Sequence, residues 1–436
     1  MKRRDLLGYG AVTAASQERI HGANGRVRVA LVGCGGRGRY VSGFMRELSG
    51  VELACCADVD LRKARRAAEA AGGNAEAVQD FRRLLERKDI DAVVVATPDH
   101  WHAGVTVMAC RAGKHVYIEK PLTHNIREGR ALVKAAGAGG TIVQAGLQHR
   151  SAPHFGECAA LVRSGALGKV HFVKIWNANN MSPAGIGTQP DVEAPAELDW
   201  DFYCGPAPLG RYNPLRAGPT FRWFRDYATG FIADFGAHRF GTVHHIMGVD
   251  APRTVSASGG RFAVGGMGEM PDLMVATYEY EGFVLSYEGS NLNAFGMPRG
   301  GSGLKYYNQR GMWDRPNGMA FHGTKGTLFA DRIGYEFYPE PGRPGSVPAG
   351  EAVWKQGADA TRQHAQSFIR NIRENLKPEA SAEFGHRVTS AALLGNIALA
   401  AGVKLKWDAA REEFEGGPAA AGRLLGREAR KPWNFA

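Results

Sequence analysis

The sequence lacks several features that would place the chain in a special class of protein. It has no apolar run of the roughly 18 residues that a membrane-spanning helix needs, so we expect no transmembrane segment. It has no heptad array and no low-complexity tract, which argues against a fibrous or disordered chain. None of its six cysteines forms a CxxC pair, which argues against a disulfide framework and against a zinc site. These absences leave a globular protein.

Positive charge is in excess, with a formal net charge of +11, but its distribution does not indicate a nucleic-acid partner. Lys and Arg are scattered along segments of helical periodicity and do not gather with aromatic residues. No known nucleic-acid-binding motif is present, so we expect no nucleic acid to bind. A chain of 436 residues is too long for one ordinary core and predicts about two or three domains.

The first 24 residues form a separate feature. Arg3 and Arg4 are adjacent, and a short stretch of small, mildly apolar residues follows up to Ser16. This pattern is typical of a twin-arginine export signal, which carries folded proteins across a membrane. The alternative is a disordered basic start. We assign residues 1–24 to the signal and expect a periplasmic or exported protein, or a cytoplasmic one if the leader does not function.

Residues 25–148 alternate between apolar runs and helical patterns. The apolar runs predict five strands, at 27–32, 51–57, 91–96, 115–118 and 141–145. Strands that alternate with helices are typical of a parallel sheet covered on both faces and joined by right-handed crossovers. We therefore predict an α/β domain here.

Residues 149–436 have a different texture and predict an α+β domain. A long passage rich in Pro, Gly and Asn runs to about residue 220, too long to be an idle loop. Alternating segments predict an open, mostly antiparallel sheet, with strands at 170–176, 254–262, 273–280, 283–290, 319–322 and 327–331. Two helices, at 361–375 and 382–401, precede a polar tail. An uncovered apolar sheet face favours a homodimer or homotetramer.

A glycine-rich turn follows the first strand. Gly33 allows a tight bend, Gly35 allows close approach of a pyrophosphate, and Gly38 lets the helix pack on the strand. Gly36 and Arg37 complete the loop, and the helix N-terminus offers free N–H groups to phosphates. Asp58 ends the second strand, where a carboxylate accepts hydrogen bonds from ribose hydroxyls and repels a 2′-phosphate. We predict a Rossmann domain that binds NAD, with NADP less favoured; the alternative is a glycine turn in a flavodoxin-like domain.

Glu119-Lys120-Pro121 follows the fourth strand, at the sheet edge where doubly wound folds bind ligands. Pro121 favours an extended Lys120, whose ammonium can stabilise negative charge on a carbinol oxygen. A surface Glu–Lys pair that ends a strand is the alternative.

A third motif runs from Gly230 to His238. Asp234 and His238 are spaced i, i+4, so on one helix they face the same way. A histidine oriented by a carboxylate is a good general base near neutral pH. The alternatives are a core histidine, or half of a metal site completed by His244 or His245. We cannot assemble further ligands and expect no metal.

In this order, the glycine loop, Glu119-Lys120-Pro121 and the Gly230–His238 stretch resemble the Gfo/Idh/MocA family (glucose–fructose oxidoreductase and inositol dehydrogenase). The stretch from Thr97 to His102, with Pro98, resembles the family's third-strand motif, which lies against the nicotinamide half of the cofactor. Three later stretches, 200–206, 321–327 and 404–408, resemble an exported branch of that family.

The resemblance implies roles for individual residues. Lys120, Asp234 and His238 form the catalytic group, and Glu119 and Gln148 lie beside the cofactor. His238 takes the hydroxyl proton, Asp234 orients His238, and Lys120 polarises the same oxygen. The candidate substrate wall consists of Arg150, Trp176, Asn177, Trp223 and Tyr227. A packing role is the alternative for each of them, since aromatic residues usually pack.

The expected reaction is hydride transfer between nicotinamide and a secondary alcohol of a sugar, glycoside or cyclitol, with C3 as the candidate carbon. One alternative is an NAD-recycling glycosidase that acts by oxidation and elimination. Another is a non-catalytic dinucleotide-binding sensor, which would not need the Lys, Asp and His set.

Overall fold

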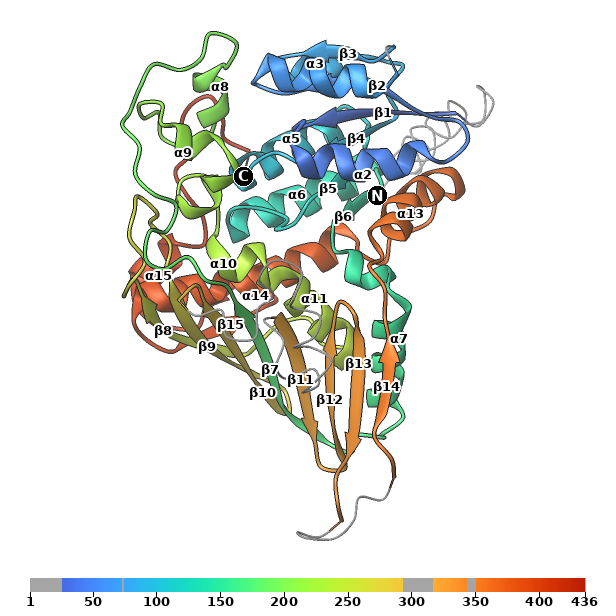
Figure 1. Cartoon of the computed structure of the whole chain (residues 1–436), viewed down its shortest axis with the longest axis vertical. Helices are drawn as coiled ribbons and strands as arrows, with labels where there is room; N and C mark the ends of the chain where they lie inside the picture. Colours follow the sequence, from blue (N-terminus) through green and yellow to red (C-terminus); the bar gives the residue numbers. More distant parts are fainter. Residues whose placement is uncertain (1–25, 73, 293–316, 343–349, 436) are drawn as a thin grey trace, which may run out of the picture.

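Two β-sheets form the framework of the molecule (Figure 1). The computed structural model describes residues 26–72, 74–292, 317–342 and 350–435. The expected leader, residues 1–24, lies outside the described residues. None of the helices in these ranges combines the length and the apolar character needed to cross a membrane.

The first sheet is parallel and has the strand order β3-β2-β1-β4-β5-β6, which confirms the predicted Rossmann domain. Its strands are β1 Val27–Val32, β2 Val51–Ala57, β3 Glu76–Val78, β4 Ala92–Val95, β5 His115–Ile118 and β6 Val143–Ala145. Its helices are α2 Gly36–Arg46, α3 Leu61–Ala70, α4 Arg82–Leu85, α5 Asp99–Arg111 and α6 Ile126–Gly139. The strand order reverses between β1 and β4, so the carboxyl ends of these two strands form the crevice where such sheets bind ligands.

The second sheet has ten strands and is open and mostly antiparallel, as predicted; one pair, β7 with β10, is parallel. In spatial order the strands are β14 Val353–Gln356, β13 Gly334–Pro339, β12 Gly326–Asp331, β11 Asn317–Gly323, β7 Val170–Ala178, β10 Phe283–Ser290, β9 Leu273–Tyr280, β8 Thr254–Gly260, β15 Leu405–Asp408 and β16 Glu413–Phe414. The predicted polar tail is therefore wrong in part: Leu405 and Trp407 are buried, and their strand extends the sheet beyond β8.

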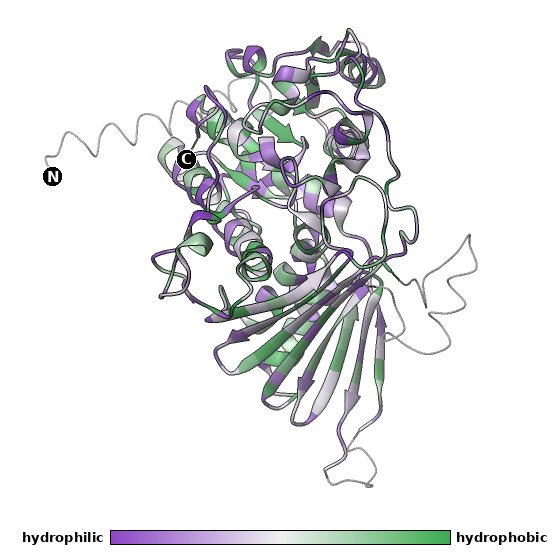
Figure 2. Ribbon diagram, turned by 90° about the vertical axis from the view of Figure 1, so that its left-hand side faces the viewer, coloured by the Kyte–Doolittle hydropathy of each residue, from purple (hydrophilic) through white to green (hydrophobic). Residues whose placement is uncertain are grey.

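Helices cover one face of the second sheet. They are α7 Pro153–Arg163, α11 Gly236–Met247 and α14 Ala382–Ala401, which contact β12, β7 and β8 respectively. Figure 2 shows these helices behind the sheet and none of the described helices in front of it. Val275 and Val284 are exposed on this open face.

Residues 179–229, the connecting segment, fold back onto the Rossmann domain. The segment contains α8 Trp200–Cys204, α9 Pro214–Ala217 and the 3-10 helix η2 Pro219–Trp223. The N–H of Leu61 donates to the carbonyl of Glu197 at 3.0 Å, and the N–H of Asp199 donates to Val59 at 2.9 Å. The long passage is therefore a cover beside β2, not an idle loop.

Helix α13, Thr361–Glu374, also returns to the Rossmann domain. Its Phe368 and Ile372 are buried in the same core as Val29 and Tyr117. A division of the chain at residue 148 thus leaves the first core without one of its covering helices.

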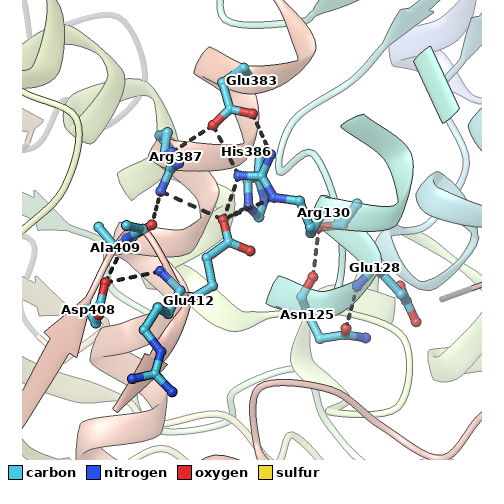
Figure 3. A network of polar contacts seen from close by, with 12 residues as sticks. Asn125, Glu128, Arg130, Glu383, His386, Arg387, Asp408, Ala409 and Glu412 are labelled. Atoms are coloured by element: carbon cyan, nitrogen blue, oxygen red, sulfur yellow. Dashed lines mark hydrogen bonds and ion pairs between the residues drawn. The ribbon is translucent and has the colours of Figure 1, made fainter. Parts of the chain in front are cut away.

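A polar network joins the two parts of the chain (Figure 3). Arg130 of α6 binds Glu383 of α14 at 2.6 and 3.0 Å and Glu412 at 2.6 Å. His386 of α14 lies 2.7 Å from the same oxygen of Glu412. Helix α6 follows the Glu119-Lys120-Pro121 motif, and α14 packs on α11. The network therefore joins α6 to α14 next to elements that carry the site described below.

Candidate active site

The glycine loop has the geometry that its sequence predicts. Gly33 has φ +90°, and a Cβ there would lie 2.5 Å from the backbone of Ala96. A Cβ at Gly38 would lie 2.3 Å from the carbonyl oxygen of Gly33. Gly35 and Gly36, in contrast, face open space, and α2 begins there without a side-chain cap. The loop therefore leaves room and free N–H groups for a phosphate.

Asp58 braces this loop as well as facing it. Its two carboxylate oxygens accept hydrogen bonds from the N–H of Cys34 at 2.8 Å and of Asp60 at 2.9 Å. Burial raises the pKa of Asp58, although Lys63 and the two N–H donors act in the opposite direction.

A first cavity of about 630 Å³ opens beside the loop. It collects the predicted dinucleotide-binding residues Gly33, Gly35, Gly36, Arg37, Asp58, Thr97 and Pro98. Its other wall comes from the connecting segment, including Leu198, Tyr203, Tyr212 and Phe221. A ligand in this cavity would lie between the Rossmann domain and that segment.

A second cavity of about 480 Å³ adjoins the first, and both are lined by Arg37, Thr97 and Arg222. It collects the predicted residues His102, Glu119, Lys120, Gln148, Asp234 and His238. Asp234 ends α10, Gly230–Asp234, and Gln148 begins the 3-10 helix η1, Gln148–Ser151. Residues from four separate motifs thus meet Gln148 in one place.

His102 and Arg37 line this cavity and connect the elements around it. The two ring nitrogens of His102 lie 2.7 Å from the carbonyl of Pro121 and 2.9 Å from that of Thr97. Arg37 donates to Glu119 at 2.7 Å and to Gln148 at 3.5 Å. These contacts tie the ends of β4 and β5 to the glycine loop.

Lys120 is held by Asp234. The ammonium donates to the carboxylate at 2.5 Å and to the backbone carbonyl of the same residue at 2.7 Å. Arg222 lies 3.1 Å from the other carboxylate oxygen. Burial acts to raise the pKa of Asp234, but the charges and hydrogen bonds of Lys120 and Arg222 outweigh it and the pKa is lowered. An ammonium has three N–H donors, so Lys120 has one left for a ligand.

This geometry corrects the predicted pairing of Asp234 with His238. No hydrogen bond joins the two side chains in the described part of the chain. They lie on different helices, since α10 ends at Asp234 and α11 begins at Gly236. The carboxylate binds Lys120 and Arg222 instead, because charge-assisted hydrogen bonds to cations are stronger than one to a neutral imidazole.

His238 faces the second cavity as a neutral imidazole. Burial lowers its pKa well below the usual value, and His149 and Lys120 act in the same direction. The ring centroids of His149 and His238 are 5.0 Å apart. The Nδ1 atom of His238 is buried and has no partner among the described residues. A neutral imidazole at this place can accept a proton.

Comparison with known proteins now identifies the family. The family model described as "Oxidoreductase family, NAD-binding Rossmann fold" matches residues 27–147. The model described as "Oxidoreductase family, C-terminal alpha/beta domain" matches residues 159–279. The chain belongs to the Gfo/Idh/MocA family. The description of the first model confirms the predicted cofactor, NAD, and the first cavity beside the glycine loop is the candidate NAD site.

Relatives of this Gfo/Idh/MocA protein include several polyol dehydrogenases. Inositol 2-dehydrogenase 4 of Saccharopolyspora erythraea is 34% identical over 169 residues, which cover 38% of this chain and 50% of the relative. The match thus spans about half of that protein. Levoglucosan dehydrogenase of Pseudarthrobacter phenanthrenivorans is 24% identical over 374 residues, 78% of this chain and 86% of the relative. A solved levoglucosan dehydrogenase with NADH and levoglucosan shares the fold, with a TM-score of 0.65, 17% identity, and coverage of 87% of this chain and 99% of the other.

None of the five residues of the predicted substrate wall lines the second cavity. Arg150 contacts His245 and the ring of Phe384. Asn177 comes nearest, because its amide donates at 2.6 Å to Asn317, which does line the cavity. Trp176 lies against Gly318. Trp223 and Tyr227 belong to the packing of the connecting segment, the first beside Gly268 and the second in a buried cluster.

The actual lining includes residues that sequence reasoning missed: Asp99, Phe221, Arg222, Phe235, Arg239, Asn317, Asp331, Arg332 and Ile333. Arg222 and Arg239 are direct sequence neighbours of two predicted site residues, Trp223 and His238. The aromatic ring of Trp223 favours a substrate wall in the sequence, but Arg222 is the residue that lines the cavity.

The histidines proposed as alternative metal ligands have other contacts. His244 lies 2.8 Å from the Tyr280 hydroxyl, and His245 contacts Arg150. Among the residues that the structure describes, no group of three or more His, Cys, Asp or Glu side chains is arranged to hold a metal ion.

Proposed function

We propose that the protein is an NAD-dependent oxidoreductase that acts on a secondary alcohol of a sugar, glycoside or cyclitol. The observation that carries this proposal is the second cavity, where Lys120 and His238 face the same space directly beside the NAD site. The printed names of the relatives, inositol and levoglucosan dehydrogenases, support the same class of substrate.

NAD, when bound, supplies the hydride acceptor or donor of this reaction. Lys120 uses its remaining N–H to bind the reacting oxygen of the substrate and to stabilise negative charge on it. His238 is neutral and accepts the hydroxyl proton. Asp234 is a positioning residue, which fixes the direction of the Lys120 ammonium through two hydrogen bonds.

The finer assignments extend this proposal. C3 is the proposed carbon, and export through the leader at residues 1–24 is the proposed location. The connecting segment supports retention of the dinucleotide, because it forms one wall of the NAD site. The exposed Val275 and Val284 on the open sheet face support a homodimer or homotetramer. An NAD-recycling glycosidase would use the same groups and is distinguished by its products.

The test is to incubate the purified protein and NAD with inositols, levoglucosan, free sugars and glycosides while recording nicotinamide absorbance and released products. Oxidation without release of an aglycone is the expected result. A 3-deoxy analogue should be inert, because it has no carbinol hydride at C3. Lys120→Met should abolish most turnover, whereas Lys134→Met, on the exposed face of α6, should not. Absence of any absorbance change with every polyol, in a protein that binds NAD, would refute the proposal and favour the sensor.

A further inference from the structure

Arg239 is an unusual arginine. It follows His238 on α11, lines the second cavity, and is only 5% exposed. Its guanidinium donates no hydrogen bond to any described residue, and its Nε atom is buried without a partner there. Burial and the charge of Arg332 lower the pKa of Arg239 to about 10, which still leaves it positively charged at neutral pH.

Arg332 brings a second guanidinium to the same cavity. It lies in the turn between β12 and β13, far from α11 in sequence, and it is exposed. No ion pair joins it to a described carboxylate, in the ranges given above. Its repulsion acts on Arg239 more strongly than the attraction by Asp331 does.

Two carboxylates of the cavity are already engaged by other cations. Glu119 accepts from Arg37, and Asp234 accepts from Lys120 and Arg222. They therefore do not neutralise the two guanidiniums of Arg239 and Arg332.

Two half-buried arginines elsewhere in the described chain are paired with carboxylates. Arg130 binds Glu383 and Glu412, and Arg427 binds Glu128 at 2.8 Å. A buried charge without a partner is costly, so an arginine that only supports the fold is expected to have a carboxylate beside it. Among the described residues no carboxylate forms a hydrogen bond or ion pair with Arg239, although the charge of Asp331 in the same cavity attracts it, and this indicates that the partner of Arg239 is a ligand.

We propose that the substrate is an acidic polyol, whose carboxylate or phosphate ester is bound by Arg239 and Arg332. The proposal rests on the proposed function, since it places the acidic group in the cavity that holds Lys120 and His238. A guanidinium presents planar, paired N–H donors that match the oxygens of either anion. Two of them at one end of the cavity would fix which carbinol carbon reaches Lys120.

The test compares glucose, glucuronate and glucose 6-phosphate, which are matched in ring but differ in charge. Turnover with NAD is measured for the wild type, Arg332→Gln, Arg239→Lys and the control Arg253→Gln, whose arginine is 66% exposed and lines neither cavity. Arg332 is exposed, so its replacement does not endanger folding. Calorimetry with NADH-loaded protein measures binding of each sugar independently of turnover.

We expect kcat/KM for one of the two acids to exceed that for glucose by at least about 10-fold, as a charge-assisted hydrogen bond implies. Arg332→Gln should lower the ratio of kcat/KM for this acid to kcat/KM for glucose by roughly 10-fold to 100-fold. Arg239→Lys keeps the positive charge but loses the paired N–H donors of the guanidinium. It should therefore also lower kcat/KM for the acidic sugar. Preference for glucuronate or for glucose 6-phosphate identifies the anion.

Three outcomes separate this proposal from the proposed function. In the first, glucose is oxidised at least as fast as both acids, and the variants affect all three sugars equally. This overturns the proposal of an acidic substrate and keeps the proposed dehydrogenase. Binding of an acid that depends on Arg332, without any turnover, keeps the anion site and overturns the dehydrogenase. Neither binding nor turnover of any sugar overturns both.

Discussion

Replacement of Glu412 by Gln should weaken the network of Figure 3 in a way that depends on pH. Burial acts to raise the pKa of Glu412, but hydrogen bonds from His386 and Arg130 outweigh it and lower the pKa from 4.5 to about 2. If the whole shift contributed to folding, it would stabilise the native state by about 3 kcal/mol at neutral pH. The side chain is 12% exposed, so we discount for solvent screening and expect about 1.5 kcal/mol.

The expected change in melting temperature is small but measurable. The unfolding entropy of a chain of about 400 residues is roughly 0.8 kcal/mol/K, so 1.5 kcal/mol lowers Tm by about 2 °C. A carboxylate with a depressed pKa stabilises the fold above its unfolded pKa, and this contribution is lost as pH falls through its folded pKa. The Tm difference between wild type and Glu412→Gln should therefore be full at pH 7 and shrink between about pH 4.5 and pH 2.

Differential scanning fluorimetry at pH 7, 5, 4 and 3 is the assay, with Glu413→Gln as the control. Glu413 is the next residue, is 59% exposed, and pairs with Arg411, which is 74% exposed, so its loss should change Tm little. NAD affinity should be nearly the same in both variants, because neither residue lines the NAD site. A Tm difference that is equal at pH 7 and pH 3, or the same for both variants, would refute the electrostatic argument.

Three further predictions concern the site. Lys120→Met and His238→Asn should each lower kcat by about 10²–10⁴-fold while fluorescence titration finds NAD affinity nearly unchanged; near-full activity of His238→Asn at every pH would transfer the base role to Lys120. NAD should bind more tightly than NADP because Asp58 faces the first cavity, and tighter NADP binding in the same titration would remove that role from Asp58. Protein purified without added NAD should release dinucleotide on acid denaturation, and cofactor-free protein with ordinary turnover would count against retention.

The Rossmann sheet was predictable because its strands are buried on both faces and read as continuous apolar runs. Strand β3, Glu76–Val78, was not, because it has three residues of which only Val78 is buried. Strand β14, Val353–Gln356, is exposed at every position and carries no alternation that a sequence could display. Pairing with β13 creates that strand, and pairing is a property of the sheet rather than of the segment.

The candidate site likewise contains residues that the sequence predicts and residues that only the fold reveals. Gly33, Lys120 and His238 occur in local motifs, and the structure brings them to adjoining cavities. Arg332 carries no local signal, because its place in the cavity depends on where the sheet puts the β12–β13 turn. The aromatic residues of the predicted wall lie outside the second cavity for a physical reason: a tyrosine such as Tyr227 is more easily accommodated in a core than at a polar cavity.

The pairing of Asp234 determines the separate roles of Lys120 and His238. A carboxylate beside His238 would raise its pKa and make the imidazole a stronger base. With Asp234 bound to Lys120 and Arg222, burial instead keeps the pKa of His238 low. A histidine of low pKa is a weak base, so it needs a substrate hydroxyl that has been made more acidic. The fixed ammonium of Lys120 provides this by stabilising the developing alkoxide, and the two residues act on one oxygen from different elements of the fold.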